Sequence, residues 1–258
     1  MYQRAISTLG CGACAFDEAL EICRRYELDA IELRVLGNSL DLPGRLAERF
    51  GRPDLLAGAA ASLPIRVVAL DTPFKLAGAT PADRENLLRF VSWAEALGVK
   101  RLRVFDGGQR RYDATELAEA LDTLAWWRTM RTAGGWSVDL MVETHDSLLT
   151  AADVLRLADA AGGVSVLWDA HHTWHKGSEA PLRTWEAIRQ HVTHVHVKDS
   201  RSGVYVLPGT GDFPMESIRR ALARDYCGVV SLEWERWWHP ALPPLEDALQ
   251  SARERKWW

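Results

Sequence analysis

Short apolar segments alternate along the chain with longer amphipathic segments, at about 30 residues per pair. The apolar segments are rich in Val, Ile and Leu, which favours strands. The longer segments, such as FDEALEICRRY, ADRENLLRFVSWAEALG and TAADVLRLADAAG, repeat apolar residues at the spacing of an amphipathic helix. The eight strands that this pattern predicts are 4–9, 30–34, 66–71, 101–105, 139–144, 164–169, 194–198 and 229–235.

The alternation predicts an α/β protein with a parallel sheet covered by helices. A closed (β/α)8 TIM barrel uses every strand and helix, and about 250 residues is a typical length for that fold. No Gly/Ser-rich linker or change of composition divides the chain, so residues 1–258 are expected to form one domain. An open doubly wound sheet is the alternative, but its G-x-G-x-x-G fingerprint is missing after the first predicted strand.

Acidic residues and histidines cluster at the ends of the last four predicted strands, in LMVETHD, VLWDAHH, HVHVKDS and VSLEWE. The carboxyl ends of barrel strands meet at one face of the molecule. One such residue alone is more often a paired core residue, but four at successive strand ends favour a shared site. We therefore expect Glu143, Asp169, His196 and Glu233 to converge on one cation.

The period of two along a strand places His194, His196 and Lys198 on one face and the intervening valines on the other. The polar face must point into the barrel, because the outer face packs under helices. A buried column of ionisable groups is costly unless the charges are paired, and a divalent cation supplies that pairing.

Composition narrows the functional classes. The formal net charge of −4 and the scattered basic residues argue against a nucleic-acid partner. No signal peptide or membrane span is recognisable, and the four cysteines are too few for a disulfide scaffold, so a cytoplasmic location is expected. The CGAC motif of Cys11 and Cys14 is weak support for a metal or redox site. The HHTWH segment, with His171, His172 and His175, is also weak support for a second metal site.

Among the twelve tryptophans, some in the second half are expected to face a sugar-like ring. Most, including Trp126, Trp127, Trp257 and Trp258, are expected in the core or at a subunit interface, which leaves a homo-oligomer possible.

The motifs VETHDSLLT, DAHH, HVHVKDS with LPGTGDFP, and SLEWE resemble the sugar phosphate isomerase/epimerase group of xylose-isomerase-like TIM barrels, over nearly the whole chain. That group also contains inosose and dehydroshikimate dehydratases and the endonuclease IV branch. The resemblance implies one divalent metal on Glu143, Asp169, His196 and Glu233, with Glu143 and Glu233 also acting as acid and base. His172 resembles a substrate-contacting histidine of the family.

Three carboxylates and one imidazole favour Mn²⁺, with Mg²⁺ or Co²⁺ as alternatives. Four protein ligands leave about two positions for a hydroxycarbonyl substrate. His145, His172 and Lys198 are candidates for substrate contacts or for protonating a leaving group, although Lys198 also suits a role as partner of inward carboxylates. Further polar residues expected at the barrel mouth, with binding or structural roles, are Glu32, Arg34, Asp71 and Asp106.

We expect an isomerase or epimerase that acts on a small ketose-like sugar or polyol-derived compound through an enediolate. Dehydration of an inosose or dehydroshikimate-like substrate shares the first step and is the alternative. A noncatalytic sugar-binding or metal-binding barrel is more remote. An endonuclease IV-like role is remote as well, because LDTPF, RVFDGG and GVYVLPG lack the additional metal ligands of that branch.

Overall fold

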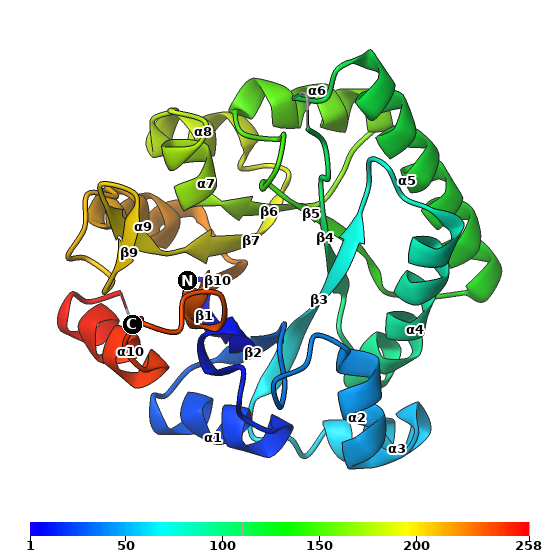
Figure 1. Cartoon of the computed structure of the whole chain (residues 1–258), viewed down its shortest axis with the longest axis horizontal. Helices are drawn as coiled ribbons and strands as arrows, with labels where there is room; N and C mark the ends of the chain where they lie inside the picture. Colours follow the sequence, from blue (N-terminus) through cyan, green and yellow to red (C-terminus); the bar gives the residue numbers. More distant parts are fainter. Residues whose placement is uncertain (110, 258) are drawn as a thin grey trace.

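The computed structural model describes residues 1–109 and 111–257, so the expectation for Trp258 lies outside the described residues. Eight parallel strands close into a barrel, and helices form a ring around it (Figure 1). The predicted TIM barrel is confirmed. The order around the barrel is β1 (Gln3–Ser7), β10 (Val229–Leu232), β7 (Val192–Val197), β6 (Val166–Asp169), β5 (Asp139–Glu143), β4 (Arg101–Phe105), β3 (Arg66–Lys75) and β2 (Ala30–Leu33).

The helices of the described chain outnumber the barrel strands, because some strand-to-strand connections contain two of them. They are α1 (Phe16–Arg25), α2 (Leu42–Phe50), α3 (Pro53–Ala60), α4 (Pro81–Leu97), α5 (Ala114–Gly134), α6 (Ala151–Ala161), α7 (Ala170–His175), α8 (Pro181–Ile188), α9 (Met215–Asp225) and α10 (Leu245–Glu254). Short 3-10 helices follow β1 at Thr8–Cys11 (η1) and β10 at Glu235–Trp237 (η2). No described helix has both the length and the apolar character needed to cross a membrane.

Local sequence explains where the longer helices begin and end. Thr80 and Thr150 form capping boxes at the starts of α4 and α6, in which each hydroxyl accepts from the backbone N–H three residues later. Gly98 and Gly162 follow the last turns in the left-handed conformation, which glycine adopts without steric cost. These signals fix where the two helices begin and end.

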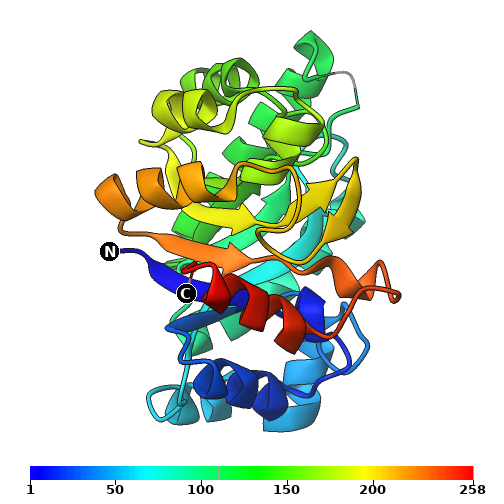
Figure 2. The same ribbon diagram turned by 90° about the vertical axis from the view of Figure 1, so that its left-hand side faces the viewer.

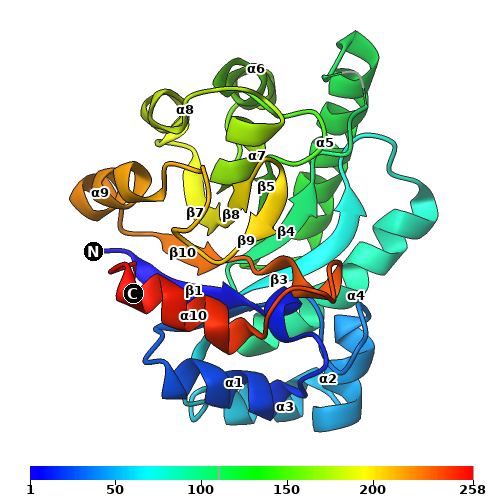
Figure 3. The same cartoon turned by 60° about the vertical axis from the view of Figure 1, so that its left-hand side comes forward.

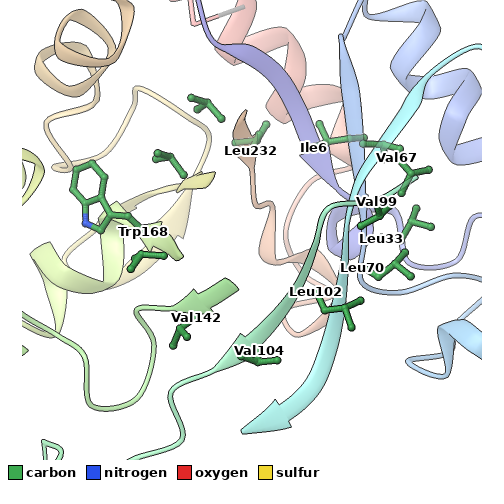
Figure 4. Close-up of a cluster of buried hydrophobic side chains, with 14 of the residues drawn as sticks. Ile6, Leu33, Val67, Leu70, Val99, Leu102, Val104, Val142, Trp168 and Leu232 are labelled. Atoms are coloured by element: carbon green, nitrogen blue, oxygen red, sulfur yellow. The ribbon is translucent and has the colours of Figure 1, made fainter. Parts of the chain in front are cut away.

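Alternation along the strands separates two hydrophobic layers. Outward residues of the strands join the helices in one large core, part of which is drawn in Figure 4. Inside the barrel the apolar residues are few and form two small clusters: Ala5, Ala30 and Val229, and Ala69, Met141 and Leu167. The inward positions nearer the carboxyl ends of the strands are polar and buried, as the period of two predicted for β7. The interior therefore changes from an apolar floor to a polar upper layer.

Several predicted boundaries need correction. The last barrel strand ends at Leu232, so Glu233 follows it directly and Glu235 belongs to η2. The strand predicted at 164–169 begins two residues later, at Val166. An antiparallel hairpin, β8 (Asp199–Arg201) and β9 (Val204–Val206), was not predicted. Figure 2 shows that this hairpin and the segment after β10 lie on the side to which the barrel strands point.

The two ends of the chain meet where the barrel closes between β1 and β10. Tyr2 Oη lies 3.5 Å from the backbone oxygen of Trp257, and Figure 3 shows α10 beside β1. The four cysteines are free, including Cys11 and Cys14 of the CGAC motif.

Candidate metal centre

The four residues predicted to bind a metal come together at the carboxyl ends of neighbouring strands. Glu143 and Asp169 end β5 and β6, His196 lies in β7, and Glu233 follows β10. One ligand atom from each of the four side chains lies within 4.8 Å of the others, and all four side chains are buried. The convergence inferred from the sequence is observed, while metal binding by these residues remains a prediction.

Unsatisfied buried atoms test whether a cation fits this cluster. Glu143 Oε2, Asp169 Oδ2 and His196 Nδ1 are inaccessible to solvent and make no hydrogen bond of good geometry with any described residue. Native proteins rarely leave buried polar atoms in this state. Three carboxylates so close together also repel each other unless positive charge lies between them. The oxygen and nitrogen donors therefore suit a divalent cation.

His196 is oriented from below by a second acidic residue. Its Nε2 lies 2.8 Å from Glu32 Oε1, while its Nδ1 lies 3.3 Å from Glu233 Oε1 and faces the carboxylate cluster. Glu32 also lies 2.7 Å from His194 Nε2 through its other oxygen. The pKa of Glu32 falls well below its usual range, because the two histidines outweigh the opposing effect of burial. A carboxylate behind a histidine is the arrangement that leaves the other ring nitrogen free for a metal.

Lys198 connects the carboxylates on the other side of the cluster. Its Nζ lies 2.8 Å from Asp169 Oδ2, donates to Glu235 Oε1 at 2.7 Å and also donates to Glu233. Burial opposes its charge, but these carboxylates raise the pKa of Lys198 well above its usual value. Of the roles considered from the sequence, the geometry matches a cationic partner for inward carboxylates.

Arg103 was missed as a site residue. It is 1% exposed, its Nε lies 3.3 Å from Glu143 Oε2, and its Nη2 lies 3.8 Å from Asp71 Oδ2. Strand alternation in RLRVF would have placed it on the inward face with Phe105. Burial, and then the charge of Glu32, raises the pKa of Asp71 to about 8. Glu32 and Asp71 thus lie beneath the carboxylate cluster rather than at the mouth of the barrel.

A cavity of about 440 Å³ opens above the cluster. Of the four candidate ligands, only Glu143 and Glu233 line it; Asp169 and His196 do not. Other lining residues, which the sequence predictions partly missed, include Arg34, Phe105, His145, His172, Tyr205 and Trp238. Trp238 is thus one tryptophan that is placed where a ring-shaped ligand could contact it.

His145 and His172 form one wall of this cavity. His145 Nδ1 lies 2.7 Å from Asp146 Oδ1, and the ring meets that of His172 edge to face at 4.9 Å. His172 lies in α7, where the first turn is capped by Asp169 Oδ1 accepting from the His172 N–H at 2.8 Å. Asp169 therefore positions the α7 backbone with one oxygen and faces the cluster with the other.

The HHTWH segment forms most of the short helix α7. Within the described chain, His171, His172 and His175 do not come together as a possible metal site. His171 instead lies against Ser200, with its Nε2 2.8 Å from the hydroxyl oxygen.

Two buried aspartates organise loops that follow barrel strands. Asp106, expected at the mouth, accepts from the backbone N–H groups of Asp146 at 2.8 Å and Leu148 at 2.6 Å, and it does not line the cavity. Asp199 accepts from the N–H groups of Gly209 and Gly211 at 2.8 Å each, and from Phe213 at 3.2 Å. The amides of the LPGTGDFP loop are therefore already occupied by an internal carboxylate.

Solved structures with a similar fold include three proteins of differing function. A probable 3-DHS dehydratase, AsbF, from Bacillus anthracis has a TM-score of 0.78 and 14% identity over 97% of each chain. The IOLI protein with a bound zinc atom has a TM-score of 0.73 and 17% identity over 98% of this chain and 95% of that chain. The 3-keto-D-glucoside 4-epimerase YcjR from E. coli has a TM-score of 0.67 and 13% identity over 98% of both chains.

Identities this low show a common fold, and a comparison with curated proteins found no match. A sequence model described as xylose isomerase-like TIM barrel matches residues 20–257. Because this match spans most of the chain and agrees with the closed parallel barrel, the protein belongs to the xylose isomerase-like TIM barrel family.

Proposed function

We propose that the protein is a divalent-metal-dependent isomerase or epimerase of a small ketose-like sugar or related hydroxycarbonyl compound. The observation that carries this proposal is the position of Glu143 and Glu233. Both belong to the candidate metal cluster, and both line the cavity above it. Two carboxylates at the edge of a cation site can exchange protons with a bound substrate, which Asp169 and His196 beneath them cannot reach.

Glu143, Asp169, His196 and Glu233 would hold the ion, and Mn²⁺ is the metal that we propose first. When bound, such an ion supplies positive charge that polarises a substrate carbonyl and favours an enediolate. The fold similarities include epimerases and a zinc-binding protein, and a hard oxygen and nitrogen donor set is compatible with several divalent ions.

The chain's own residues supply the proton transfers. One of Glu143 and Glu233 takes the proton from the carbon beside the carbonyl, and the other returns a proton to the opposite face or to the adjacent carbon. Their surroundings support this role, because Arg103 contacts Glu143 and Lys198 contacts Glu233. These cations stabilise the carboxylate form of each glutamate, which is the form that accepts a proton.

Dehydration is the second candidate, and His145 is the observation that favours it. This histidine lines the cavity and its Nδ1 is paired with Asp146, so its other nitrogen can deliver a proton to a departing hydroxyl. The probable dehydratase AsbF is among the proteins of similar fold.

A substrate screen tests both functions. The protein is loaded in turn with Mn²⁺, Mg²⁺, Co²⁺ and Zn²⁺ and incubated with ketoses, inososes and dehydroshikimate-type acids. A product of unchanged mass supports isomerisation or epimerisation, whereas a product that has lost one water supports the dehydratase. Glu143→Gln serves as the inactive control. Turnover that persists after exhaustive metal removal, or that survives in this variant, would contradict the proposal.

A further inference from the structure

Arg34 is a buried cation at the cavity, and no described carboxylate forms an ion pair with it. It follows β2 directly and is 6% exposed, and its backbone N–H donates to Thr8 Oγ1 at 2.8 Å. Its guanidinium lines the cavity, 5.8 Å from the ring centre of Phe105. The one hydrogen bond of that group within the described chain is a long one, from Nη1 to the backbone oxygen of Asp71 at 3.4 Å. No described carboxylate lies within 4.0 Å of it.

Arg103 provides the internal comparison. It lies in the same polar layer, but its guanidinium is engaged by Glu143, Asp71 and the backbone oxygen of Thr72 at 3.1 Å. Arg103 therefore neutralises charges that belong to the protein. The Arg34 guanidinium makes only the long hydrogen bond to Asp71 within the described chain, and Arg34 lines the cavity where a substrate would lie.

The guanidinium nitrogens of Arg34 that make no hydrogen bond are not among the buried unpaired atoms, so they remain accessible to a ligand. An anion there would gain charge-assisted hydrogen bonds at a largely buried cation. Burial, and then the neighbouring charge of Arg103, lowers the pKa of Arg34 to about 10, so it remains charged at neutral pH. Its fork of N–H donors matches a carboxylate or a phosphate in geometry as well as charge. Lys75 and Lys176 at the same cavity add positive charge at its rim.

We propose that the substrate of this enzyme carries an anionic oxygen group, which binds the guanidinium of Arg34 while the hydroxycarbonyl lies at Glu143 and Glu233. This inference rests on the proposed function, which it narrows to polyhydroxy acids or sugar phosphates. A carboxylate and a phosphate both present the pair of oxygens that this fork of donors binds, and the probes below distinguish them. The substrate class is therefore a polyhydroxy carbonyl compound that carries one of these two anionic groups.

Two pairs of probes test the inference by calorimetry on the Mn²⁺-loaded protein: shikimate with its uncharged methyl ester, and ribose 5-phosphate with ribose. We expect the charged member of at least one pair to bind at least about tenfold more tightly than its neutral partner, since charge-assisted hydrogen bonds have roughly that effect. A preference confined to ribose 5-phosphate over ribose would assign the anion as phosphate. Equal binding of both charged probes and their neutral partners overturns the inference without any variant.

Substitutions locate the effect. Arg34→Met should weaken the preferred acid about tenfold or more and leave its neutral partner within about threefold. Arg34→Lys should recover part of the loss, because it keeps the charge without the planar fork. Arg66→Met, at the opposite end of the barrel, is the matched control and should change nothing. An undiminished preference in folded Arg34→Met assigns the anion to another group and refutes the role of Arg34.

The same titrations separate this inference from the proposed function. Mn²⁺ binding is measured on the wild type and on each variant, and the anion preference is measured again in chelator. Intact Mn²⁺ binding without anion preference overturns the inference and leaves the metal-dependent function standing. Intact anion preference without Mn²⁺ binding overturns only the metal-dependent function.

Discussion

Glu32 Oε1 lies 2.8 Å from His196 Nε2, on the side of the imidazole that faces away from the carboxylate cluster. This contact links β2 to β7 across the barrel interior and fixes which ring nitrogen is available for a cation. Glu32 was expected among the substrate-binding residues, but the structure places it beneath the cluster, outside the lining of the cavity.

We predict that Glu32→Gln weakens Mn²⁺ binding by roughly 10- to 100-fold, because a neutral amide no longer favours the N–H on Nε2 and the lone pair on Nδ1. Isothermal titration with Mn²⁺ measures the change in Kd. Glu246→Gln, on the exposed side of α10, is the control and should bind as the wild type does. Unchanged affinity in a folded Glu32→Gln protein would show that this contact does not orient the ligand.

Metal removal should destabilise the protein. The wild type is expected to bind one divalent ion per chain, because one cluster contains all four predicted ligands. At 100 times Kd, binding contributes about 2.7 kcal/mol to stability. For a domain of this size that corresponds to a Tm higher by roughly 5–10 °C, which scanning calorimetry with and without chelator would detect. Identical melting curves under the two conditions would argue against a structural contribution of the ion.

Glu143→Gln and Glu233→Gln should each reduce kcat/KM by about 10²–10⁴-fold, since the amide can neither accept the proton nor bind a cation strongly. Glu235→Gln tests the assignment of the acid after β10, because Glu235 also lines the cavity and accepts from Lys198. Glu235→Gln should reduce kcat/KM much less than either of the other two substitutions. A larger loss of kcat/KM with Glu235→Gln than with Glu233→Gln would indicate that Glu235, and not Glu233, is the metal ligand.

Asp71→Asn should change how stability depends on pH. Burial, and then Glu32, raises the pKa of Asp71 to about 8, above the unfolded value of about 4. A raised pKa means that the folded state holds its proton more tightly, so the contribution of Asp71 to stability decreases as pH rises from about 4 to about 8. The asparagine variant lacks this decrease. Urea unfolding of metal-free protein at pH 5 and pH 7.5 should show the variant gaining stability relative to the wild type at the higher pH.

Solvent deuterium should enter the carbon beside the carbonyl when the enzyme turns over its substrate in D₂O. A carboxylate base at an open cavity exchanges its proton with solvent before returning it, and both Glu143 and Glu233 line that cavity. Mass spectrometry of an isomerised or epimerised product measures the label. Product without deuterium would favour an internal hydride transfer and would leave the two glutamates as ligands only.

The barrel was predictable from the sequence because its signals are local. Each barrel strand is an apolar run, and helices such as α4 and α6 carry their own start and stop signals. The β8–β9 hairpin was not predicted because its strands have only three residues each. In addition, its turn depends on Ser202 and Gly203, which have positive φ. Such short segments lack a period that can be recognised.

The candidate cluster was predictable because its residues end successive strands, a position that depends only on the order of elements. The residues that contact this cluster could not be predicted in the same way. Alternation states that Arg103 and Glu32 point inward, but their contacts with Glu143 and His196 depend on how neighbouring strands are shifted against one another. The irregular registers at Ile31/Glu32 and Asp71/Lys75 cannot be read from residue order.

The loop after β9 has the amide arrangement of an anion-binding site, but the anion in it is the carboxylate of Asp199 from the same chain. Gly211 has no room for a side chain, since an added Cβ would lie 2.3 Å from Asp199 Oδ1. A phosphorylated substrate that approached this loop would compete with a covalently tethered anion at high effective concentration. Removing that anion, by Asp199→Gly, would therefore free three amides in the pocket lined by Gly209, Gly211 and Phe213, where a free phosphate ion could take the place of the carboxylate.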